Sequence, residues 1–321
     1  MDRPQDAGPI RLGISACLLG QPVRYDGGHK LDRFLRDTLG RWVEYVPVCP
    51  EVECGLPVPR EAMRLVGDPA RPRLVTQKTG VDLTDRMEAW AARRVRELEA
   101  ENLCGFIFKS NSPSSGMERV QVYGAGGAPV KKGVGLFARA FMEHFPLLPV
   151  EEEGRLHDPA LRENFIERLF TLKRWREAVS GGRTRGRVVE FHSRNKLLIL
   201  SHSPAHLREM GRLVAHAKEL GDAETVRRYE ALLMKALRLR ATPRKNANAL
   251  QHAAGYFKRV LTPAERRELR DVIEQYRTEL VPLLVPITLL NHYVRKYGEP
   301  YLGIQTYLNP HPLELKLRNH A

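Results

Sequence analysis

Residues 10–20 read IRLGISACLLG, a short apolar run that ends in a cysteine and a small loop. The run predicts a buried strand over residues 10–16, and VEYVPV predicts a second strand over 43–48 that also ends at a cysteine. Further predicted strands over 105–109 and 147–150 alternate with predicted helices over 29–39, 83–98 and 133–145. This alternation is typical of an α/β fold, in which a parallel sheet carries helices on both faces.

The second half of the chain shows helical patterns only. Leucines recur at helical spacing over 158–179, 202–220, 223–240 and 263–280, and Pro204 and Pro263 stand near helix starts. The stretch SGGRTRGR at 180–187 has the composition of a linker. We therefore expect a catalytic domain over 1–160, a connecting helix and linker over 161–186, and an all-α domain over 187–321.

Charge separates the same two parts. The chain has 321 residues and a formal net charge of +14. Residues 181–321 carry 25 basic and 13 acidic side chains, a net +12, which leaves 27 and 25 for residues 1–180. A near-neutral domain joined to a basic one indicates a working domain and a second unit that contacts a polyanion, with nucleic acid as the leading candidate.

Several classes of protein are disfavoured. The polar residues 1–9 lack the apolar run of a secretory signal, and the longest apolar stretch, 280–290, is short and broken by two prolines. Four cysteines are too few for a disulfide scaffold in a chain of this length. We expect a cytoplasmic protein without a membrane segment, and no obligate protein partner is evident.

Two cysteines stand at equivalent places. Cys17 follows the first strand in ISACLLG, and Cys49 follows the second in PVCPEVECG. Because ligands gather at the carboxyl ends of parallel strands, both thiols should face one crevice. No histidine lies near either motif, so thiolates favour an iron–sulfur cluster or redox thiol chemistry over zinc. A buried structural role is the alternative for either cysteine alone.

A third loop, KSNSPSSG at 109–116, follows the strand over 105–109. It is either an ordinary turn or a source of hydroxyl groups and an amine for a polar ligand. The turn-like GAGG at 124–127 lacks the Lys-Ser/Thr of a phosphate loop, so we expect a hairpin there. His202 and His206 are four residues apart, but Pro204 lies between them, and capping and packing roles are favoured over metal binding.

The motifs ISACLLG, VRYDG, VCPE, GLPVPR and FKSNSPSSG together resemble the TudS-type desulfidases over about residues 10–155. That family removes sulfur from thiolated uracil with a 4Fe–4S cluster held by three cysteines, whose open iron captures the sulfur. The helical half, with FHSRNKLLILSHSP and NALQHAAGYF, resembles a second family often fused behind the first. The whole fusion is similar to RudS-type enzymes, which convert 4-thiouridine in tRNA to uridine.

The resemblance implies roles for particular residues. Cys17 and Cys49 match two cluster ligands, and Glu51 matches the acid of the CPE motif, a general acid or base. Ser112 would orient the base or the attacking water, and Lys109 would steady negative charge. Substrate-binding candidates are Arg24, Asp26, Ser110, Ser114 and Ser115. Arg24 with Asp26, and Arg60 with Glu61, are structural ion pairs in the alternative reading.

One ligand departs from the family pattern. Ser115 stands where the single-domain enzymes usually have the third cysteine. Cys54 is the replacement we expect, because it lies five residues after Cys49 in a loop already at the site. Cys104, about 17 Å away at strand rise, and Ser115 itself are the alternatives.

A basic stretch marks the helical half. No acidic residue lies between Glu230 and Glu265, while His252, Tyr256 and Phe257 fall among the cations. Basic side chains neutralise phosphates and aromatic rings stack on unpaired bases, so we expect RNA binding there. The RNA-binding candidates are Lys235, Arg238, Arg240, Arg244, Lys245, Lys258 and Arg259.

The sequence therefore predicts an iron–sulfur enzyme that hydrolytically desulfurises 4-thiouridine in tRNA without net electron transfer. Two alternatives stay open. One is salvage of free thiouracil or 4-thiouridine monophosphate, and the other is a non-catalytic RNA-binding regulator with structural cysteines.

Overall fold

The computed structural model describes residues 8–124, 126 and 128–319, which form two compact units divided between His157 and Asp158. Most of the N-terminal stretch weighed as a signal, and two residues of the turn at 124–127, lie outside the described residues. Among the described helices, none has the length and apolar character needed to cross a membrane.

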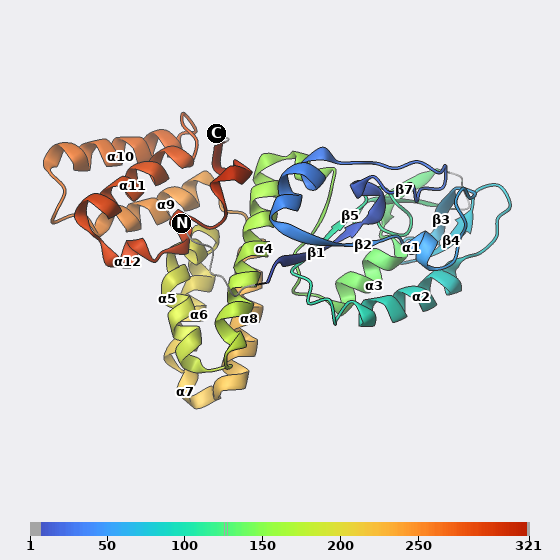
Figure 1. Cartoon of the computed structure of the whole chain (residues 1–321), viewed down its shortest axis with the longest axis horizontal. Helices are drawn as coiled ribbons and strands as arrows, with labels where there is room; N and C mark the ends of the chain where they lie inside the picture. The colour runs from blue at the N-terminus through green and yellow to red at the C-terminus, as the bar shows by residue number, and fades with distance from the viewer. Residues whose placement is uncertain (1–7, 125, 127, 320–321) are drawn as a thin grey trace. The chain divides into compact units, whose positions relative to one another are not determined.

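The N-terminal unit is built on a parallel sheet (Figure 1). Its strands are β1 (Ile10–Ser15), β2 (Val43–Val48), β5 (Phe106–Phe108) and β8 (Val150–Glu152), in the order β2-β1-β5-β8. Every neighbouring pair is parallel. The sheet therefore has one edge where all four carboxyl ends lie, as the alternating pattern predicts.

Helical segments cover both faces of this sheet. Phe106 packs against Phe137 and Phe141 of α3 (Leu136–His144) at ring distances of 5.6 and 4.8 Å, and α2 (Thr84–Glu97) lies beside α3 (Figure 1). On the opposite face, the Tyr45 hydroxyl donates to the Leu35 carbonyl oxygen at 2.7 Å. The expected α/β architecture is confirmed.

A second, mixed sheet was not predicted. It has the order β4-β3-β6-β7, with β3 (Met63–Asp68), β4 (Arg71–Thr76), β6 (Val120–Tyr123) and β7 (Pro129–Gly133). β3, β4 and β7 are rich in Arg, Lys, Pro or Gly, and β6 has only four residues, so hydrophobic periodicity gives little signal for them. The expected hairpin is present as the antiparallel pair β6–β7, and it shortens the helix predicted over 133–145.

The helix predicted over 29–39 is replaced by a π-helical turn, Phe34–Thr38, and a 3₁₀ turn, Leu39–Arg41. The reason is the backbone pairing of the residues before them. The Lys30 amide donates to the Cys17 carbonyl at 2.9 Å, and the Asp32 amide donates to the Leu18 carbonyl at 2.9 Å. These bonds to the loop after β1 hold the chain extended where helical amides would have to point elsewhere.

The second unit is all-helical over its described residues, as predicted. Its longer helices are α4 (Pro159–Ser180), α5 (Arg185–His202), α6 (Pro204–Ala215), α8 (Asp222–Arg238), α9 (Pro243–Gly255), α10 (Pro263–Arg277) and α11 (Leu284–Tyr297). The short helices are α7 (Ala217–Leu220) and α12 (Pro300–Gly303). Its core includes Trp175, which stacks on Tyr229 at 4.9 Å.

The stretch between the two predicted domains differs from a long linker. Helix α4 belongs to the second unit, and α5 begins at Arg185, so only 181–184 lie outside a helix between them. Trp175 of α4 and Phe191 of α5 pack at 5.1 Å, which ties the two helices together. Tertiary packing thus makes helix from residues whose composition favours a linker.

Candidate active site

Three loops meet around one cavity at the carboxyl edge of the parallel sheet. The loops follow β1, β2 and β5, and the cavity has a volume of about 410 Å³. Predicted site residues that line it are Cys17, Arg24, Cys49, Glu51, Lys109, Ser110, Ser112 and Ser115. The strand-end rule therefore brings these residues together as expected.

The two thiols are buried in the cavity wall. Cys17 follows β1 in a 3₁₀ turn, and Cys49 is the residue before α1 (Pro50–Glu53). Burial, aided by the negative charge of Glu51, raises the pKa of Cys17 to about 11 and that of Cys49 to about 12. Each thiol thus needs added positive charge, such as a bound metal centre, before it ionises near neutral pH.

Glu51 stands between a thiol and a hydroxyl. One of its carboxylate oxygens accepts a hydrogen bond from Ser114 Oγ at 2.5 Å, and the other lies 3.5 Å from Cys49 Sγ. The Arg60 guanidinium lies 3.8 Å from the same carboxylate. A carboxylate held in this way at a cavity wall is placed to accept or donate a proton.

The start of α3 fixes Ser114. The Ser114 carbonyl accepts hydrogen bonds from the amides of Phe137 and Ala138 at 2.9 and 3.2 Å. A Cβ at Gly135 would lie 2.5 Å from the carbonyl carbon of Ser114, so this close approach requires glycine. Ser114 is fully buried and does not line the cavity; it orients Glu51 where substrate contact was expected.

Ser112 organises its own loop. Its hydroxyl oxygen lies 3.0 Å from Ser114 Oγ and accepts a hydrogen bond from the Ser115 amide at 3.1 Å. It also lines the cavity, so the expected role toward base or water is compatible with its position. Ser115 is 3% exposed and lines the same cavity as the two thiols.

Lys109 is paired. Its ammonium group lies 2.5 Å from a Glu153 carboxylate oxygen and 3.0 Å from Ser110 Oγ. The Ser110 amide also donates to Glu153 at 2.7 Å. Part of the positive charge expected to steady the substrate is therefore used to hold the loop after β5.

The two other cysteines lie outside the cavity wall. The Cys54 thiol donates to the Glu51 carbonyl oxygen at 3.2 Å, and Cys54 does not line the cavity. Cys104 is buried before β5, where its amide donates to the Arg11 carbonyl. Of the three candidates for a third ligand, Ser115 is the one that lines the cavity with Cys17 and Cys49.

In the two suggested ion pairs, Arg24 with Asp26 and Arg60 with Glu61, the arginines line the cavity and the acidic residues do not. Arg24 lies 3.6 Å from the Asp26 carboxylate, so the ion pair of the alternative reading is present. Asp26 is exposed and also accepts a hydrogen bond from the Gly28 amide at 3.0 Å. Glu61 accepts from the Lys78 and Thr79 amides and does not line the cavity. Sequence reasoning missed Glu153 altogether, although it follows β8 at the same sheet edge and the strand-end rule would have found it.

Of the seven residues predicted to bind RNA, six are exposed and Lys245 is half-buried. Among the aromatic residues in the same stretch, Tyr256 is 48% exposed and stacks on Tyr301 at 4.8 Å. Phe257 is fully buried and packs against Tyr293, so it belongs to the core and is not a base-stacking ring. Apolar surface burial explains this, since Phe carries no polar atom that favours exposure.

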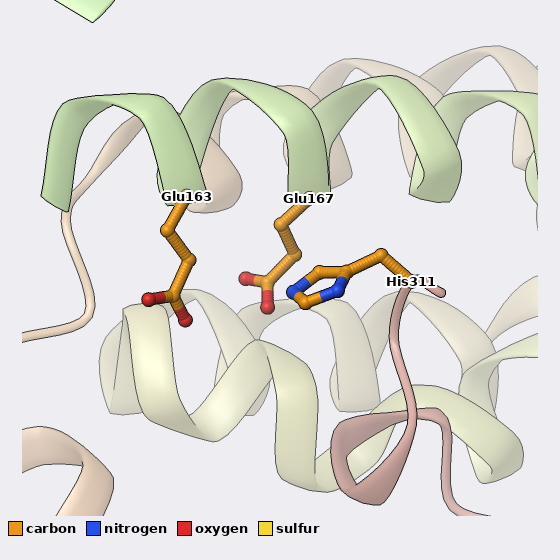
Figure 2. Close-up of side chains that lie close together, drawn as sticks. All are labelled: Glu163, Glu167 and His311. Atoms are coloured by element: carbon orange, nitrogen blue, oxygen red, sulfur yellow. The ribbon is translucent and has the colours of Figure 1, made fainter. Parts of the chain in front are cut away.

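His202 and His206 have separate partners. His202 Nε2 lies 2.5 Å from a Glu167 carboxylate oxygen, while His206 Nδ1 lies 2.8 Å from the Ser203 hydroxyl. Figure 2 shows Glu167 beside Glu163 and His311, three groups whose ligand atoms lie within 4.8 Å of one another. We assign no metal to this cluster, because the Arg318 guanidinium already pairs with both carboxylates at 3.3 and 3.1 Å.

Comparisons with known proteins match both units. A family model described as 2-thiouracil desulfurase matches residues 12–153, and one described as a protein of unknown function (DUF1722) matches residues 196–312. The chain is 32% identical over 158 residues to the uncharacterized protein YbgA of Escherichia coli (strain K12), covering 49% of this chain and 94% of YbgA. It is 30% identical over 108 residues to the uncharacterized protein YbbK of Bacillus subtilis (strain 168), covering 32% of this chain and 71% of YbbK. Among solved structures, the chain is similar to TudS, a 4Fe–4S-dependent thiouracil desulfidase, with 32% identity. The match covers 47% of this chain and 96% of TudS, with a TM-score of 0.39.

Proposed function

Because the chain belongs to the 2-thiouracil desulfurase family through residues 12–153 and continues into a DUF1722 region over 196–312, we propose that it removes sulfur from 4-thiouridine in tRNA. In this reaction one water molecule replaces the sulfur at C4, and the products are uridine and hydrogen sulfide. No electron donor or acceptor is consumed.

One observation carries the proposal. Two buried thiols, a carboxylate and a serine hydroxyl, from Cys17, Cys49, Glu51 and Ser115, line a single cavity at the carboxyl edge of the sheet. Thiols that lie beside a proton-transfer group suit a reaction that takes up sulfur and moves protons. The cavity, about 410 Å³, falls in the range of pockets that take small molecules such as a single base.

The residues present fit an iron–sulfur cluster. Soft thiolates are the ligands that iron–sulfur centres prefer, and Cys17 and Cys49 both line the cavity. We propose Cys17 and Cys49 as two ligands and Ser115, which lines the cavity where Cys54 does not, as the third. When bound, a 4Fe–4S cluster would supply an electron-accepting, sulfur-binding iron.

The chain's own residues position and move protons. Glu51, held by Ser114, accepts a proton from the water that attacks C4 and returns it to the departing sulfur. The Arg60 guanidinium lies 3.8 Å from this carboxylate and also lines the cavity. Lys109 and Arg24 line the cavity as cations that stabilise negative charge on the substrate.

The helical unit would hold the RNA. The acid-free basic stretch presents Arg238, Arg240, Arg244, Lys258 and Arg259 as exposed cations that neutralise phosphates. A thiolated base in folded tRNA must be reached or extruded. An RNA-binding surface separate from the reaction cavity would hold the polymer while this happens. Free thiouracil would need no such surface.

The choice of substrate is tested by comparing thiolated tRNA with 4-thiouridine monophosphate on anaerobically reconstituted protein. We expect a much higher kcat/KM for the tRNA, measured by loss of thiouridine absorbance and release of sulfide. A clear preference for the monophosphate would favour salvage. Absence of iron, labile sulfide and turnover would favour a non-catalytic RNA-binding protein.

The ligand set is tested by counting iron and labile sulfide in alanine variants. Cys17→Ala and Cys49→Ala should lose most of the cluster, and Ser115→Ala should lower its retention. Cys54→Ala and Cys104→Ala should retain it, because neither thiol lines the cavity. Ser115→Cys should strengthen retention, since a thiolate binds iron more tightly than an alcohol. Loss of the cluster in Cys54→Ala but not in Ser115→Ala would restore Cys54 as the third ligand.

A further inference from the structure

A smaller cavity of the N-terminal unit adjoins the reaction cavity. Its volume is about 220 Å³, and the two cavities share four lining residues, Met63, Gln77, Asn111 and Pro113. The second sheet lines the rest of it, with Arg64 of β3 and Tyr123 of β6. Pockets that enclose a whole small molecule measure roughly 300–1,000 Å³. This space therefore suits one part of a larger ligand that extends out of the reaction cavity.

Arg64 and Tyr123 form a pair in the lining of the smaller cavity. The guanidinium carbon of Arg64 lies 5.2 Å from the centre of the Tyr123 ring, within the range of a cation–π contact. The Nε atom of Arg64 is buried and has no hydrogen-bond partner among the described residues, and none of the carboxylates in that part of the chain forms an ion pair with it. The aromatic ring thus positions the guanidinium, and its charge is left for a ligand.

The sheet face that carries this pair is basic. Cross-strand partners and alternate residues of a strand share one face of a sheet. By this register the face also carries three exposed cations, Arg71, Arg73 and Lys131, and Asp68 is the one acidic residue that the four strands place there. Arg73 pairs with Asp82 at 3.4 Å, which leaves a net positive charge. Because residues 1–180 as a whole are nearly neutral, this local excess indicates a polyanionic ligand.

The wall shared by the two cavities carries amide donors. Gln77 and Asn111 line both cavities, and both residues are exposed. The Gln77 amide nitrogen donates to the Met63 carbonyl oxygen at 3.4 Å, which uses one of its two N–H groups. Side-chain amides commonly donate to phosphate oxygens of nucleic acids. A phosphate that joins two nucleotides would lie at this wall when one of the two bases occupies the reaction cavity.

We infer that the smaller cavity binds the nucleotide next to the thiolated one in the RNA substrate. Its base stacks on the Arg64–Tyr123 pair, and the phosphate between the two nucleotides accepts hydrogen bonds from Gln77 and Asn111. Aromatic rings and guanidinium planes both stack on unpaired bases, with little preference among the bases. The inference rests on the proposed function in taking thiolated RNA as the substrate. It adds that the N-terminal unit itself binds more of the RNA than the reacting base.

Binding is tested by calorimetry on the reconstituted full-length protein, with uridine monophosphate and two dinucleotides in which adenosine precedes or follows uridine. At least one dinucleotide should bind at least about fivefold tighter than the monophosphate, the effect of one stacked base. Tyr123→Leu should reduce this ratio to near one, whereas Tyr123→Phe, which keeps the ring, should retain it. Arg64→Gln should lower the ratio. Arg93→Gln, the same change at an exposed arginine of α2 outside both linings, should not.

Three binding results would overturn the inference: a ratio near one for both dinucleotides, a ratio that Tyr123→Leu leaves unchanged, or no saturation by any of the three ligands. A melting curve for each variant checks that the unit is folded. Turnover of thiolated tRNA and of 4-thiouridine monophosphate is measured separately. If neither is desulfurised while the binding ratio holds, the proposed function fails and the two-nucleotide site stands. If thiolated tRNA is desulfurised and the ratio is near one, only the inference fails.

Discussion

Two carboxylates, half-buried Glu51 in the N-terminal unit and buried Glu167 in the helical unit, are held in opposite ways. Glu51 accepts from the Ser114 hydroxyl, lies beside a thiol and lines a cavity, with its nearest cation 3.8 Å away. Glu167 is bonded at 2.5 Å to His202 and at 3.1 Å to Arg318, and its side chain is 5% exposed. Both are acidic groups next to polar clusters, yet their surroundings suit different tasks.

The two carboxylates differ in how far their neighbours depend on the negative charge. Protonating Glu167 would leave Arg318 and His202 without their buried counter-charge, so this carboxylate is locked in its charged form and stabilises the fold. Glu51 instead accepts a hydrogen bond from a neutral hydroxyl and lines a cavity, where we propose that it transfers protons. The local partners thus distinguish the carboxylate proposed for proton transfer from the structural one.

The largest expected effect on desulfurisation comes from replacing Glu51. Glu51→Gln keeps the size of the side chain and removes its proton-transfer capacity, so desulfurisation should fall by about 10²- to 10⁴-fold. Iron content and melting temperature should change little. A variant that retains a tenth or more of wild-type turnover would exclude Glu51 as the general acid or base.

Glu167→Gln should instead lower stability and leave the turnover of the folded protein nearly unchanged. Removing one charge from a buried pair leaves Arg318 poorly compensated, and the free energy of unfolding should drop by about 3–5 kcal/mol. Denaturant unfolding of the full chain, followed by the far-ultraviolet circular dichroism of its helices, measures it. The matched change Glu177→Gln, at a half-exposed position 3.4 Å from Lys173 Nζ, should shift stability by less than about 1 kcal/mol. Equal effects of the two variants would contradict the structural role.

The pH dependence of stability should differ between Glu163 and Glu167, which both belong to the helical unit. Burial raises the pKa of Glu163 to about 7 from an ordinary 4.5, so the folded state holds a proton that the unfolded state releases between these values. Stability should therefore fall as pH rises through this window, and Glu163→Gln should flatten the fall. Burial also acts on Glu167, but the hydrogen bond and charge of His202 and the charge of Arg318 lower its pKa to about 2. Its contribution is lost only as pH falls from 4.5 toward 2, which acid titration of the unfolding free energy would show.

The smallest expected effect concerns Ser114. Ser114→Ala removes the hydroxyl that orients Glu51, and kcat should fall about tenfold, the effect of one hydrogen bond to a charged group. KM and iron content should stay near wild type, because Ser114 does not line the cavity. Ser110→Ala is the comparison, since its hydroxyl bonds to Lys109 and Glu153. A raised KM in Ser114→Ala would show instead that Ser114 contacts substrate.

The main features of the fold could be read from pattern, because buried parallel strands and long amphipathic helices leave strong periodic signals. The strand β2 and the helix α4 illustrate this. The second sheet could not be predicted, because β3, β4 and β7 carry many charged residues, Pro or Gly, and β6 has only four residues. The helix predicted over 29–39 was wrong before Phe34 for another reason. The amides of Lys30 and Asp32 pair with carbonyls of the loop after β1, which is distant in sequence.

For the site, strand-end position alone brought Cys17, Cys49 and Glu51 together. The same rule overlooked Glu153, because the end of β8 was predicted too early. It also could not separate residues within one loop. Cys54 and Ser115 both belong to converging loops, yet Ser115 lines the cavity and Cys54 turns its thiol to a backbone carbonyl.

The sequence by itself determined that cysteines and serines end neighbouring parallel strands and that positive charge is concentrated in the helical half, because both depend on order along the chain. Only the tertiary structure decided which side chains share a cavity and which are neutralised by partners. Glu51 and Glu167 look alike as letters in the sequence. Their roles depend on groups 63 and 151 residues away, Ser114 and Arg318, and folding alone brings these within hydrogen-bond distance.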